Sequence, residues 1–574
     1  MKKRARLIDF LVGLLLACLV VGSYFMPGGG LLEPLELRTY DLRAQLRGNL
    51  DPSSEIVIIA IDDESIENLG RWPWPRNRIG EMLRLLNRAA PKVIGLDILY
   101  TEMDRNPGLI ELKGLQERYR ALVRKRRIVQ RKARFEAEFA AAAGRLDGDS
   151  QLLSAMATVP QLVLPMYFVT SGVSGEAPAE PPEALRRSIL SVKILPPNPG
   201  RPPARIVEAR AVSYPLVPFL RVAEGSGHVT MFKDSDGVIR RETPAILYGK
   251  HYYPSFALQL VARYRGIESK DITVTPGRSV EFDGTTIPLD ETQSMLVTFS
   301  GDRHTFRYYS FHEVLGGKVP LEVFKDKIVI LGPSARGIAK FYATPLSRSL
   351  PSVEFIANVA ENILNRRFLT RPEWAMKAEL IAVAVAALFI MLILPRLRVL
   401  ASITVTVLLV GLVLGVGAYL LKERAEWVKV SYPAFLFAAG CLASMLRRIL
   451  LAGYGAPSEE ELEAQGCLIL GLRAQAQEQL DEAFEKFQLC PQDENLLEVL
   501  YQLGLDFEGK RKFSKAVSVY KHMAVDAPGF KDIAEKLEKL KDMKDGALLG
   551  ARGAGGLLAP DGEKAVLGRY EIEK

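Results

Sequence analysis

EIVIIAIDDESI (Glu55–Ile66) and KVIGLDIL (Lys92–Leu99) are the two segments that decide the fold of the central domain. In the first, the run Ile56–Ile61 is apolar and largely β-branched, which is typical of a strand buried on both faces of a sheet. The second segment has the same character, and Arg78–Arg88 between them has a helical pattern. A strand, a helix and a strand at this spacing predict a βαβ unit with parallel strands, and so an α/β domain with a mixed sheet.

Polar residues follow these strands, where ligands bind in open α/β sheets, just past the carboxyl ends of the strands. A third buried run, Lys327–Leu331, leads into the glycine-containing loop Gly332–Gly337. The candidate ligand-binding residues are Asp62, Asp63, Arg76, Asp97, Ser334 and Thr344. The alternative is structural, because acidic residues at strand ends often cap a following helix or bind a turn.

Four apolar stretches flank the central domain, one before it and three after it. They are Leu7–Met26, Ala375–Leu394, Val399–Leu421 and Val428–Leu446. Each approaches or exceeds the roughly 20 residues that an α-helix needs to cross a bilayer. The sequence therefore predicts four transmembrane helices, and large aqueous regions on both sides of a membrane favour a receptor over a transporter.

The charges beside these stretches predict their orientation through the excess of Lys and Arg on the cytoplasmic side of a membrane. The basic residues are Lys2, Lys3, Arg4 and Arg6 before the first span, Arg396 and Arg398 between the second and third, and Arg447 and Arg448 after the fourth. We expect cytoplasmic termini in a bacterial inner membrane, with residues 27–374 periplasmic. A cleaved signal peptide is the rival interpretation of the first span, but no A-x-A site follows it.

Several kinds of chemistry find no support in the sequence. The four cysteines all lie outside residues 27–374, so no disulfide framework is expected there. The net charge of +8 is spread over 574 residues and does not imply nucleic acid. The five histidines have no metal-ligand spacing, GPSARG lacks the Lys-Ser/Thr of a phosphate loop, and no G-x-S-x-G motif is present. We therefore expect no catalytic centre, metal or cofactor.

One segment of the central domain is predicted to be a helical insertion and another to be a loop. Residues 109–143 form a long helical segment with ten Lys and Arg between Lys113 and Arg134. It is either a basic arm for anionic lipid or a partner, or the solvated face of a helix packed on its neighbour. Residues 171–205 are rich in Pro, Gly and Ser and are predicted to form a loop.

The central domain resembles the extracellular sensory domain of the CHASE family, class two (CHASE2). The motifs that carry the resemblance are AIDDESIENLGRWPWPR (Ala60–Arg76), KVIGLDILYTE (Lys92–Glu102), GHVTMFKDSDGVIRR (Gly227–Arg241), YPSFALQL (Tyr253–Leu260) and VILGPSARGIAKFYATPLSRSLPSVEFIANVAENIL (Val329–Leu364). The resemblance covers nearly the whole domain and implies sensing of an unidentified extracytoplasmic ligand. One departure is Lys340, where the family's comparable loop usually carries an acidic residue.

The tail at 457–543 contains an internal repeat of 33 residues. Leu470, Gly471, Ala474, Ala483, Phe487 and Cys490 align with Leu503, Gly504, Phe507, Ala516, Tyr520 and Met523. These small and large positions are those at which two antiparallel helices interlock in a tetratricopeptide repeat. The predicted all-α unit is either a helical spacer or a module that binds a protein partner or supports a homodimer.

Residues 544–574 are predicted to be a flexible Gly/Ala-rich linker that ends in LGRYEIEK (Leu567–Lys574). This ending resembles the opening strand of a serine/threonine protein kinase, just before its Gly-rich loop, and the rest of a kinase is not in the sequence. Whether the chain belongs to an enzyme is thus left open.

The predicted domains are 1–26 (N-terminal transmembrane helix), 27–374 (sensor), 375–448 (three transmembrane helices), 457–543 (repeats) and 544–574 (linker). Together they indicate a membrane receptor that senses an extracytoplasmic ligand or envelope state and controls a cytoplasmic kinase. The alternative is a non-enzymatic membrane scaffold whose repeats recruit a soluble partner. The lipid bilayer, a protein partner and a second copy of the chain are the expected contacts.

Overall fold

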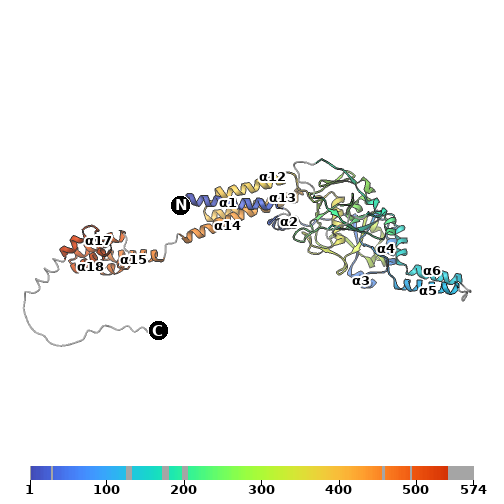
Figure 1. The fold of residues 1–574 in the computed structure, drawn as a ribbon, viewed down its shortest axis with the longest axis horizontal. Helices are drawn as coiled ribbons and strands as arrows, with labels where there is room; N and C mark the ends of the chain where they lie inside the picture. The colour runs from blue at the N-terminus through green and yellow to red at the C-terminus, as the bar shows by residue number, and fades with distance from the viewer. Residues whose placement is uncertain are drawn as a thin grey trace, which may run out of the picture. The chain divides into compact units, whose positions relative to one another are not determined.

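The computed structural model describes residues 2–26, 30–124, 132–170, 180–196, 205–454, 459–490 and 494–540. It divides into two compact units, Met1–Met445 and Leu446–Lys574. The first unit holds an α/β domain and a bundle of long helices, and the second holds short helices (Figure 1). The predicted linker and the kinase-like ending at 567–574 lie outside the described residues.

A largely parallel sheet forms the centre of the α/β domain. Its strands run in the order β15-β1-β16-β2-β3-β6, and β7 also pairs with β3. All of these pairings are parallel except that of β6. The strands are β1 (Ile56–Ile61), β2 (Val93–Leu96), β3 (Leu162–Val169), β6 (Ala211–Ser213), β7 (Gly225–His228), β15 (Arg307–Ser310) and β16 (Ile328–Pro333).

The predicted strands β1 and β2 are parallel members of one sheet, but they are not neighbours. β16 lies between them, with Ile58 opposite Ile330 on one side and Ile330 opposite Gly95 on the other. All six residues of β1 are buried. The continuous apolar run therefore reflects burial by helices on both faces, as predicted, while the strand inserted between β1 and β2 comes from more than 200 residues later in the chain.

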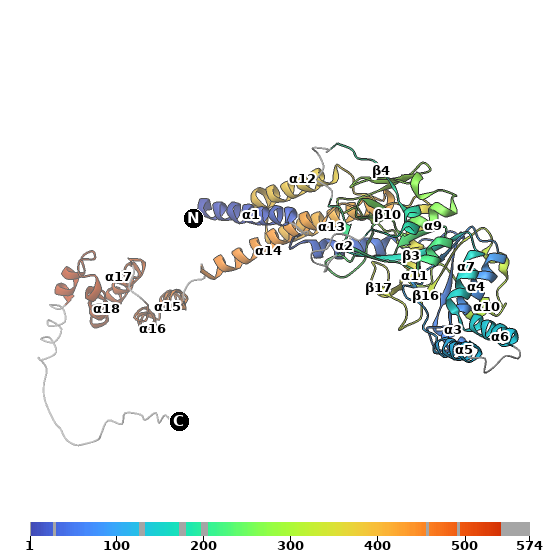
Figure 2. The ribbon, with the colours of Figure 1, turned by 45° about the vertical axis from the view of Figure 1, so that its right-hand side comes forward.

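Helices cover both faces of the sheet and make a three-layer domain (Figure 2). Alternate residues of β1 face opposite layers, because successive strand side chains point to opposite faces. Val57, Ile59 and Ile61 pack in the same cluster as the helix α4, whereas Ile56 and Ile58 pack in that of α9 and α11. The helices are α3 (Asp63–Leu69), α4 (Arg76–Arg88), α7 (Gly148–Ala157), α8 (Val217–Val222) and α10 (Phe311–Leu315) on the first face, and α9 (Phe256–Tyr264) and α11 (Ser352–Leu364) on the second.

Small sheets adjoin the main one. They are β10-β9-β5, β13-β12-β11-β4, β14-β8 and β17-β18. The predicted hairpin turn at Asp236–Gly237 is present, since the Asp234 N–H donates to the Val238 carbonyl at 2.9 Å. It joins no pair of strands, however, because β8 pairs with β14. The bounds are β4 (Ser191–Val192), β5 (Glu208–Ala209), β8 (Arg241–Glu242), β9 (Ala245–Tyr248), β10 (His251–Pro254), β11 (Thr273–Thr275), β12 (Ser279–Phe282), β13 (Thr285–Pro288), β14 (Met295–Leu296), β17 (Phe341–Tyr342) and β18 (Leu350–Pro351).

The insertion at 109–143 is helical, as predicted, and its described part forms a pair of helices. α5 (Pro107–Arg124) and α6 (Lys132–Leu146) lie side by side and project from the domain (Figures 1 and 2). Tyr119 of α5 contacts Phe135 and Phe139 of α6 with ring centroids 5.8 and 5.6 Å apart, so the two helices pack through aromatic residues. The predicted loop at 171–205 contains a short 3-10 helix, η1 (Glu183–Ser188), and β4 in its described part.

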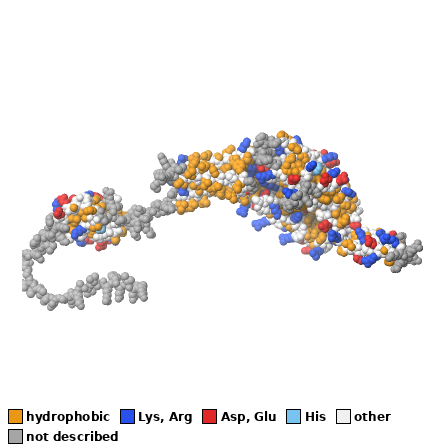
Figure 3. Space-filling model, viewed as in Figure 1, with side chains coloured by type: hydrophobic (Ala, Val, Ile, Leu, Met, Phe, Trp, Pro, Cys, Tyr) orange, Lys and Arg blue, Asp and Glu red, His pale blue; other side chains and the backbone are white. Residues whose placement is uncertain are grey.

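Within the described ranges, three helices are long and apolar enough to cross a membrane: Ala375–Arg396, Val399–Glu423 and Ser431–Leu450. The first comprises α12 (Ala375–Leu388), a π-helical turn (Phe389–Ile393) and a 3-10 turn (Leu394–Arg396); the others are α13 (Val399–Glu423) and the greater part of α14 (Ser431–Tyr454). The helix α1 (Lys2–Phe25) contains a shorter apolar segment, Phe10–Phe25. Side chains on the outside of this bundle are largely hydrophobic (Figure 3).

α1 packs within the same bundle. Val20 is buried together with Val383 and Ala386 of α12 and Tyr432 of α14. Close approach of α13 to its neighbour depends on Gly417, where an added Cβ would lie 2.6 Å from Val430 Cγ1. Gly411 and Gly415 of the same helix are not at such a contact, since nothing lies within 4 Å of an added Cβ at either position.

The second unit is helical, as the sequence predicts. A Cβ added to Gly471 would lie 2.3 Å from Phe487 Cε1, and one added to Gly504 would lie 2.4 Å from Tyr520 Cε1. These glycines allow a large residue of the next helix to approach the backbone, at equivalent positions of the 33-residue repeat. The helices are α15 (Glu459–Ala476), α16 (Leu480–Phe487), α17 (Glu494–Gly509) and α18 (Phe513–Asp526).

Gly504→Ala should destabilise the α17–α18 pair by about 1–3 kcal/mol through overpacking. This outweighs the roughly 1 kcal/mol by which alanine favours a helix over glycine, because the Tyr520 ring is held by a hydrogen bond to Glu508 at 2.7 Å. Trypsin should therefore cut the pair faster in the full chain. Gly509→Ala, where nothing lies within 4 Å of the added Cβ, is the matched control. Equal cleavage of both variants would contradict the packing argument.

Candidate functional site

The carboxyl ends of β1, β2, β15 and β16 lie at one edge of the main sheet because these strands are parallel. Asp62 follows β1, Asp97 follows β2 and Ser334 follows β16. The structure thus places three of the six predicted site residues at this edge. Their side chains nevertheless have different environments, and among the described residues the Asp97 carboxylate has only a weak contact, with Ser352.

Asp62 caps a helix, which is the alternative that the sequence left open. Its Oδ1 accepts a hydrogen bond from the backbone N–H of Ser65 at 2.8 Å, at the start of α3. The same oxygen accepts from the Ser310 hydroxyl at 2.8 Å, and Ser310 Oγ lies 2.7 Å from Nδ1 of His312. This is not a catalytic triad, because the carboxylate contacts the serine rather than the imidazole.

Asp63 and Arg76 lie away from Asp97. Asp63 is exposed in the first turn of α3. Arg76 forms an ion pair with Asp149 and its guanidinium lies 4.7 Å from the centre of the Tyr100 ring. It therefore holds the start of α4 against α7.

Ser334 and Thr344 are buried residues of turns. The Ser334 N–H donates to the Ile61 carbonyl at 3.0 Å, which joins the ends of β16 and β1. Thr344 Oγ1 accepts from the Ser347 N–H at 3.1 Å. Both residues shape the loops around the sheet edge.

Asp97 has the environment expected of a binding carboxylate. Burial raises the pKa of its carboxyl to about 7, although the Lys340 ammonium and the Ser352 hydroxyl act in the opposite direction. Ser352 Oγ is 3.5 Å from Asp97 Oδ2, which is a weak contact. Gly332 permits this position, since an added Cβ there would lie 3.0 Å from Asp97 Cβ.

Three residues near Asp97 were missed by the sequence analysis. The Tyr342 hydroxyl lies within electrostatic range of Asp97, Tyr167 and Glu242, and burial together with these groups raises its pKa to about 12. The ammonium of Lys340 lies 5.1 Å from the centre of the Tyr167 ring. We call Asp97, Tyr167, Glu242, Lys340 and Tyr342 the carboxyl-edge cluster.

Glu242 is the least satisfied member of this cluster. Its side chain is only 3% exposed and burial raises its pKa to about 8, opposed by the Ser255 hydroxyl and the Thr243 backbone. Within the described part of the chain, Oε2 has no hydrogen-bond partner. A buried polar atom without a partner costs about 1–3 kcal/mol and calls for an explanation.

His228 lies at the end of β7, where it pairs with Ser255, the N-cap of α9. It is fully buried, and this burial lowers its pKa to about 3. Among the described residues neither ring nitrogen meets the geometry of a hydrogen bond; the Thr243 backbone interacts with it only weakly. The imidazole is therefore neutral.

A second polar site lies where the α/β domain meets the helical bundle. Glu36, in α2 (Glu33–Arg47), is buried and ion-paired with Arg43. Its carboxylate also accepts from Trp427 Nε1 and from the Ser431 N–H, both at 3.0 Å. α2 is therefore joined to the start of α14.

Glu379 is the second carboxylate of this site. An acidic residue near the end of an apolar stretch is predicted to pair with water, but Glu379 is only 2% exposed and binds protein groups instead. It accepts from Tyr24 at 2.5 Å, from Arg371 at 2.8 Å and from the Lys429 N–H at 2.7 Å. These groups come from α1, the segment before α12 and the segment before α14. We call Glu36, Arg43, Arg371, Glu379, Trp427 and Lys429 the bundle-end network.

Two adjacent arginines connect the network to the α/β domain. Arg240 is 1% exposed and binds Asp41 of α2, with Nη2–Oδ2 2.7 Å, as well as Asp234 and Asp236. The guanidinium of Arg241 lies 5.4 Å from the centre of the Trp427 ring. Because β8 consists of Arg241 and Glu242, one short strand contributes to both the bundle-end network and the carboxyl-edge cluster.

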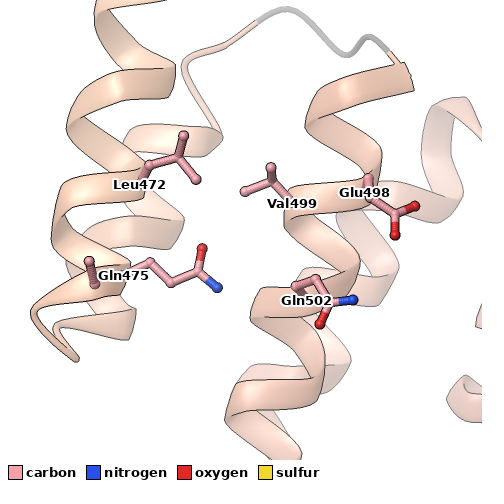
Figure 4. Close-up of a pocket in the computed structure, with 6 residues that line it drawn as sticks. Leu472, Gln475, Glu498, Val499 and Gln502 are labelled. Atoms are coloured by element: carbon pink, nitrogen blue, oxygen red, sulfur yellow. The ribbon is translucent and has the colours of Figure 1, made fainter.

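The helical tail contains a separate groove of about 350 Å³ between α15 and α17. Figure 4 shows Leu472 and Gln475 facing Val499 and Gln502 across it. The lining is mostly apolar, and Leu472 is 42% exposed. Among the residues that the structure describes, no group of three or more His, Cys, Asp or Glu side chains could hold a metal ion.

Comparison with known proteins gives one match. A family model described as the CHASE2 domain matches residues 14–394, which is more than half of the 574 residues. The search of curated proteins and the search of solved structures found no match.

Proposed function

This chain belongs to the CHASE2 domain family, and we propose that it is the sensory and transmembrane part of a bacterial receptor that responds to a ligand at the carboxyl-edge cluster. CHASE2 is an extracellular sensory domain of signalling receptors, and three helices of the chain are suited to crossing a membrane. In the proposal α1 is a fourth span, because it packs in the same bundle. The α/β domain is then periplasmic and both termini are cytoplasmic.

The observation that carries the proposal is the position of β8. Successive residues of a strand point to opposite faces. Glu242 accordingly belongs to the carboxyl-edge cluster, and Arg241 stacks on Trp427 of the bundle-end network. The partner strand β14 repeats the pattern: Met295 is in the core of the α/β domain, and Leu296 packs with Trp427. A ligand that moves β8 changes contacts at both sites.

The bundle-end network suits transmission because it joins α1, α12 and the start of α14 to α2 and to the segment before α12. Glu36 contacts the start of α14, and Glu379 contacts α1 and the segment before α14. A buried, fully paired network has discrete arrangements rather than a continuum, since breaking one pair leaves a buried charge unpaired. Ligand binding then favours one arrangement of the helices over another.

The proposed orientation is tested with alkaline phosphatase fusions, since this enzyme is active only after export. A fusion after Arg424, in the α13–α14 segment, should be active. Fusions after Arg398 and after Tyr454 should be inactive, because these positions follow the basic ends of the spans. The opposite pattern would place the α/β domain in the cytoplasm and exclude extracytoplasmic sensing.

The proposed output is a cytoplasmic serine/threonine kinase, supported by the resemblance of residues 567–574 to the start of such a domain. The second candidate is a scaffold whose tail binds a protein partner, which the groove at Leu472 and Val499 favours. The coding DNA downstream of Lys574 distinguishes the kinase output from the scaffold. A reading frame that continues beyond Lys574 into a Gly-rich loop supports the kinase, and a stop codon with no adjacent kinase gene supports the scaffold.

A further inference from the structure

We infer that the ligand of the carboxyl-edge cluster is a small organic cation with a primary ammonium or guanidinium group, and that Lys340 occupies its place in the unliganded protein. This inference rests on the proposed function and specifies its ligand. It starts from the two carboxyl groups of the cluster. Asp97 is contacted only weakly by Ser352, and Glu242 Oε2 is buried without a hydrogen-bond partner among the described residues.

Glu242 is buried and Asp97 is partly buried. Removing carboxylates from water is costly without a function, because they then need donors or a counter-ion. Glu242 has nearby donors in the Ser255 hydroxyl and the Thr243 backbone. Asp97 has one nearby cation, the ammonium of Lys340. A ligand with two or three N–H donors would satisfy the remaining oxygens and would favour their charged forms.

The aromatic residues of the cluster also suit a cation. The negative face of a tyrosine ring attracts an ammonium or guanidinium within about 6 Å of its centre. The Lys340 ammonium makes this contact with Tyr167 at 5.1 Å. Tyr342 adds a hydroxyl within range of both carboxyl groups. Lys340 therefore places an ammonium from within the chain against the Tyr167 ring and near Asp97, where a ligand amine would lie.

Lys340 can be displaced because its side chain is exposed. It lies in the segment between β16 and β17, and the Ser352 N–H at the start of α11 donates to its carbonyl at 2.9 Å. The neighbouring Ala343 carbonyl accepts from Ile239 at 2.8 Å, next to Arg240 and β8. A ligand that displaces Lys340 can therefore shift Ile239 and Arg240, the residues directly before β8.

The cationic ligand should bind the carboxyl-edge cluster more tightly at pH 8 than at pH 6. The raised pKa values of about 7 for Asp97 and about 8 for Glu242 mean that both groups gain negative charge over this interval. The groups that face them are the Lys340 ammonium, the hydroxyls of Tyr342, Ser352 and Ser255, and the Thr243 backbone. None of the hydroxyls ionises in this interval, so the carboxyl groups set the pH dependence.

Calorimetric titration of the full chain in detergent at pH 8 tests the inference, with propylamine, putrescine and agmatine as probes and succinate as the anionic comparator. The amines should bind and succinate should not. Asp97→Asn should weaken amine binding at least tenfold, and Lys340→Met should strengthen it several-fold because the competing ammonium is gone. Asp63→Asn and Lys318→Met, both at exposed positions, are matched controls and should leave binding unchanged.

The inference is overturned if no amine binds, if Asp97→Asn binds as the unchanged chain does, or if succinate binds and Lys340→Met abolishes it, which would make Lys340 an anion ligand. These outcomes are distinguishable from failure of the proposed function. If an amine binds and the bundle-end network stays unchanged, the proposed receptor function is refuted and the inferred class of ligand stands. If a ligand of another class binds and alters the network, the receptor function stands and the inferred class of ligand is refuted.

Discussion

Replacing Glu36 with Gln should lower the apparent melting temperature of the chain by about 5 °C. The change removes the charge that pairs with Arg43, whose side chain is 4% exposed. An unpaired buried charge costs about 3–5 kcal/mol. The entropy of unfolding grows by about 2.1 cal/mol/K per residue, so each kcal/mol corresponds to roughly 1–2 °C in a domain as large as residues 27–374. Tryptophan fluorescence of the full chain in nanodiscs measures the transition, and Trp427 is itself bonded to Glu36 at 3.0 Å.

Glu64→Gln is the control for this experiment, because Glu64 is an exposed carboxylate of α3. It should melt within 1–2 °C of the unchanged chain, since exposed charges contribute about 0–1 kcal/mol. A double variant with Met at both Glu36 and Arg43 should regain part of the loss, as replacing a buried ion pair by apolar residues is often nearly neutral. An unchanged melting temperature of Glu36→Gln would mean that the bundle-end network does not hold α2 to the bundle.

Asp97→Asn should make the α/β domain more stable at pH 8 and leave its stability unchanged at pH 4. The folded-state pKa of Asp97 is raised from 3.8 to about 7. The folded state therefore binds its proton more tightly than the unfolded state does, and the stability that this proton provides is lost as pH rises from about 4 through 7. Asparagine does not titrate, so the variant escapes this loss.

At pH 8 the unfolding free energies of Asp97→Asn and of the unchanged chain should differ by at most about 4 kcal/mol, since one pKa unit corresponds to 1.36 kcal/mol. Urea unfolding of the full chain at pH 4, 6 and 8 measures it. Asp63→Asn provides the control, because that carboxylate is exposed and its replacement should have no pH-dependent effect. Equal destabilisation of Asp97→Asn at all three pH values would show that Asp97 serves as a structural acceptor and is not held ready for a ligand.

The central strands could be predicted from the sequence because burial on both faces leaves a local signature. Ile56–Ile61 has no polar residue, and all of it is buried. Strand order has no such signature. The pairing of β16 between β1 and β2 depends on contacts between segments more than 200 residues apart, and no pattern within either segment records it.

The candidate site was only partly predictable for a related reason. Asp97 was found from its place at the end of a strand, but the same rule selected Asp62, which caps α3. Glu242 was missed because it follows Arg240 and Arg241, and a charged run of this kind is typical of a solvated surface. Arg240 is buried only because Asp41, Asp234 and Asp236 surround it.

Glu379 illustrates the same limit within the bundle. An acidic residue near the end of an apolar stretch is expected to reach water. Here the protein itself supplies three donors, from Tyr24, Arg371 and Lys429, so the carboxylate stays buried. Each donor lies on a different segment, and only the folded chain brings them together.

The central claim is that the carboxyl-edge cluster and the bundle-end network are coupled through β8. Fluorine NMR of the full chain labelled with 5-fluorotryptophan tests it most directly, since the chain has four tryptophans and Trp427→Phe identifies the resonance of Trp427. Titration with agmatine should shift that resonance with the calorimetric affinity, and Asp97→Asn should abolish the shift. Agmatine that binds while the Trp427 resonance stays in place would contradict the account.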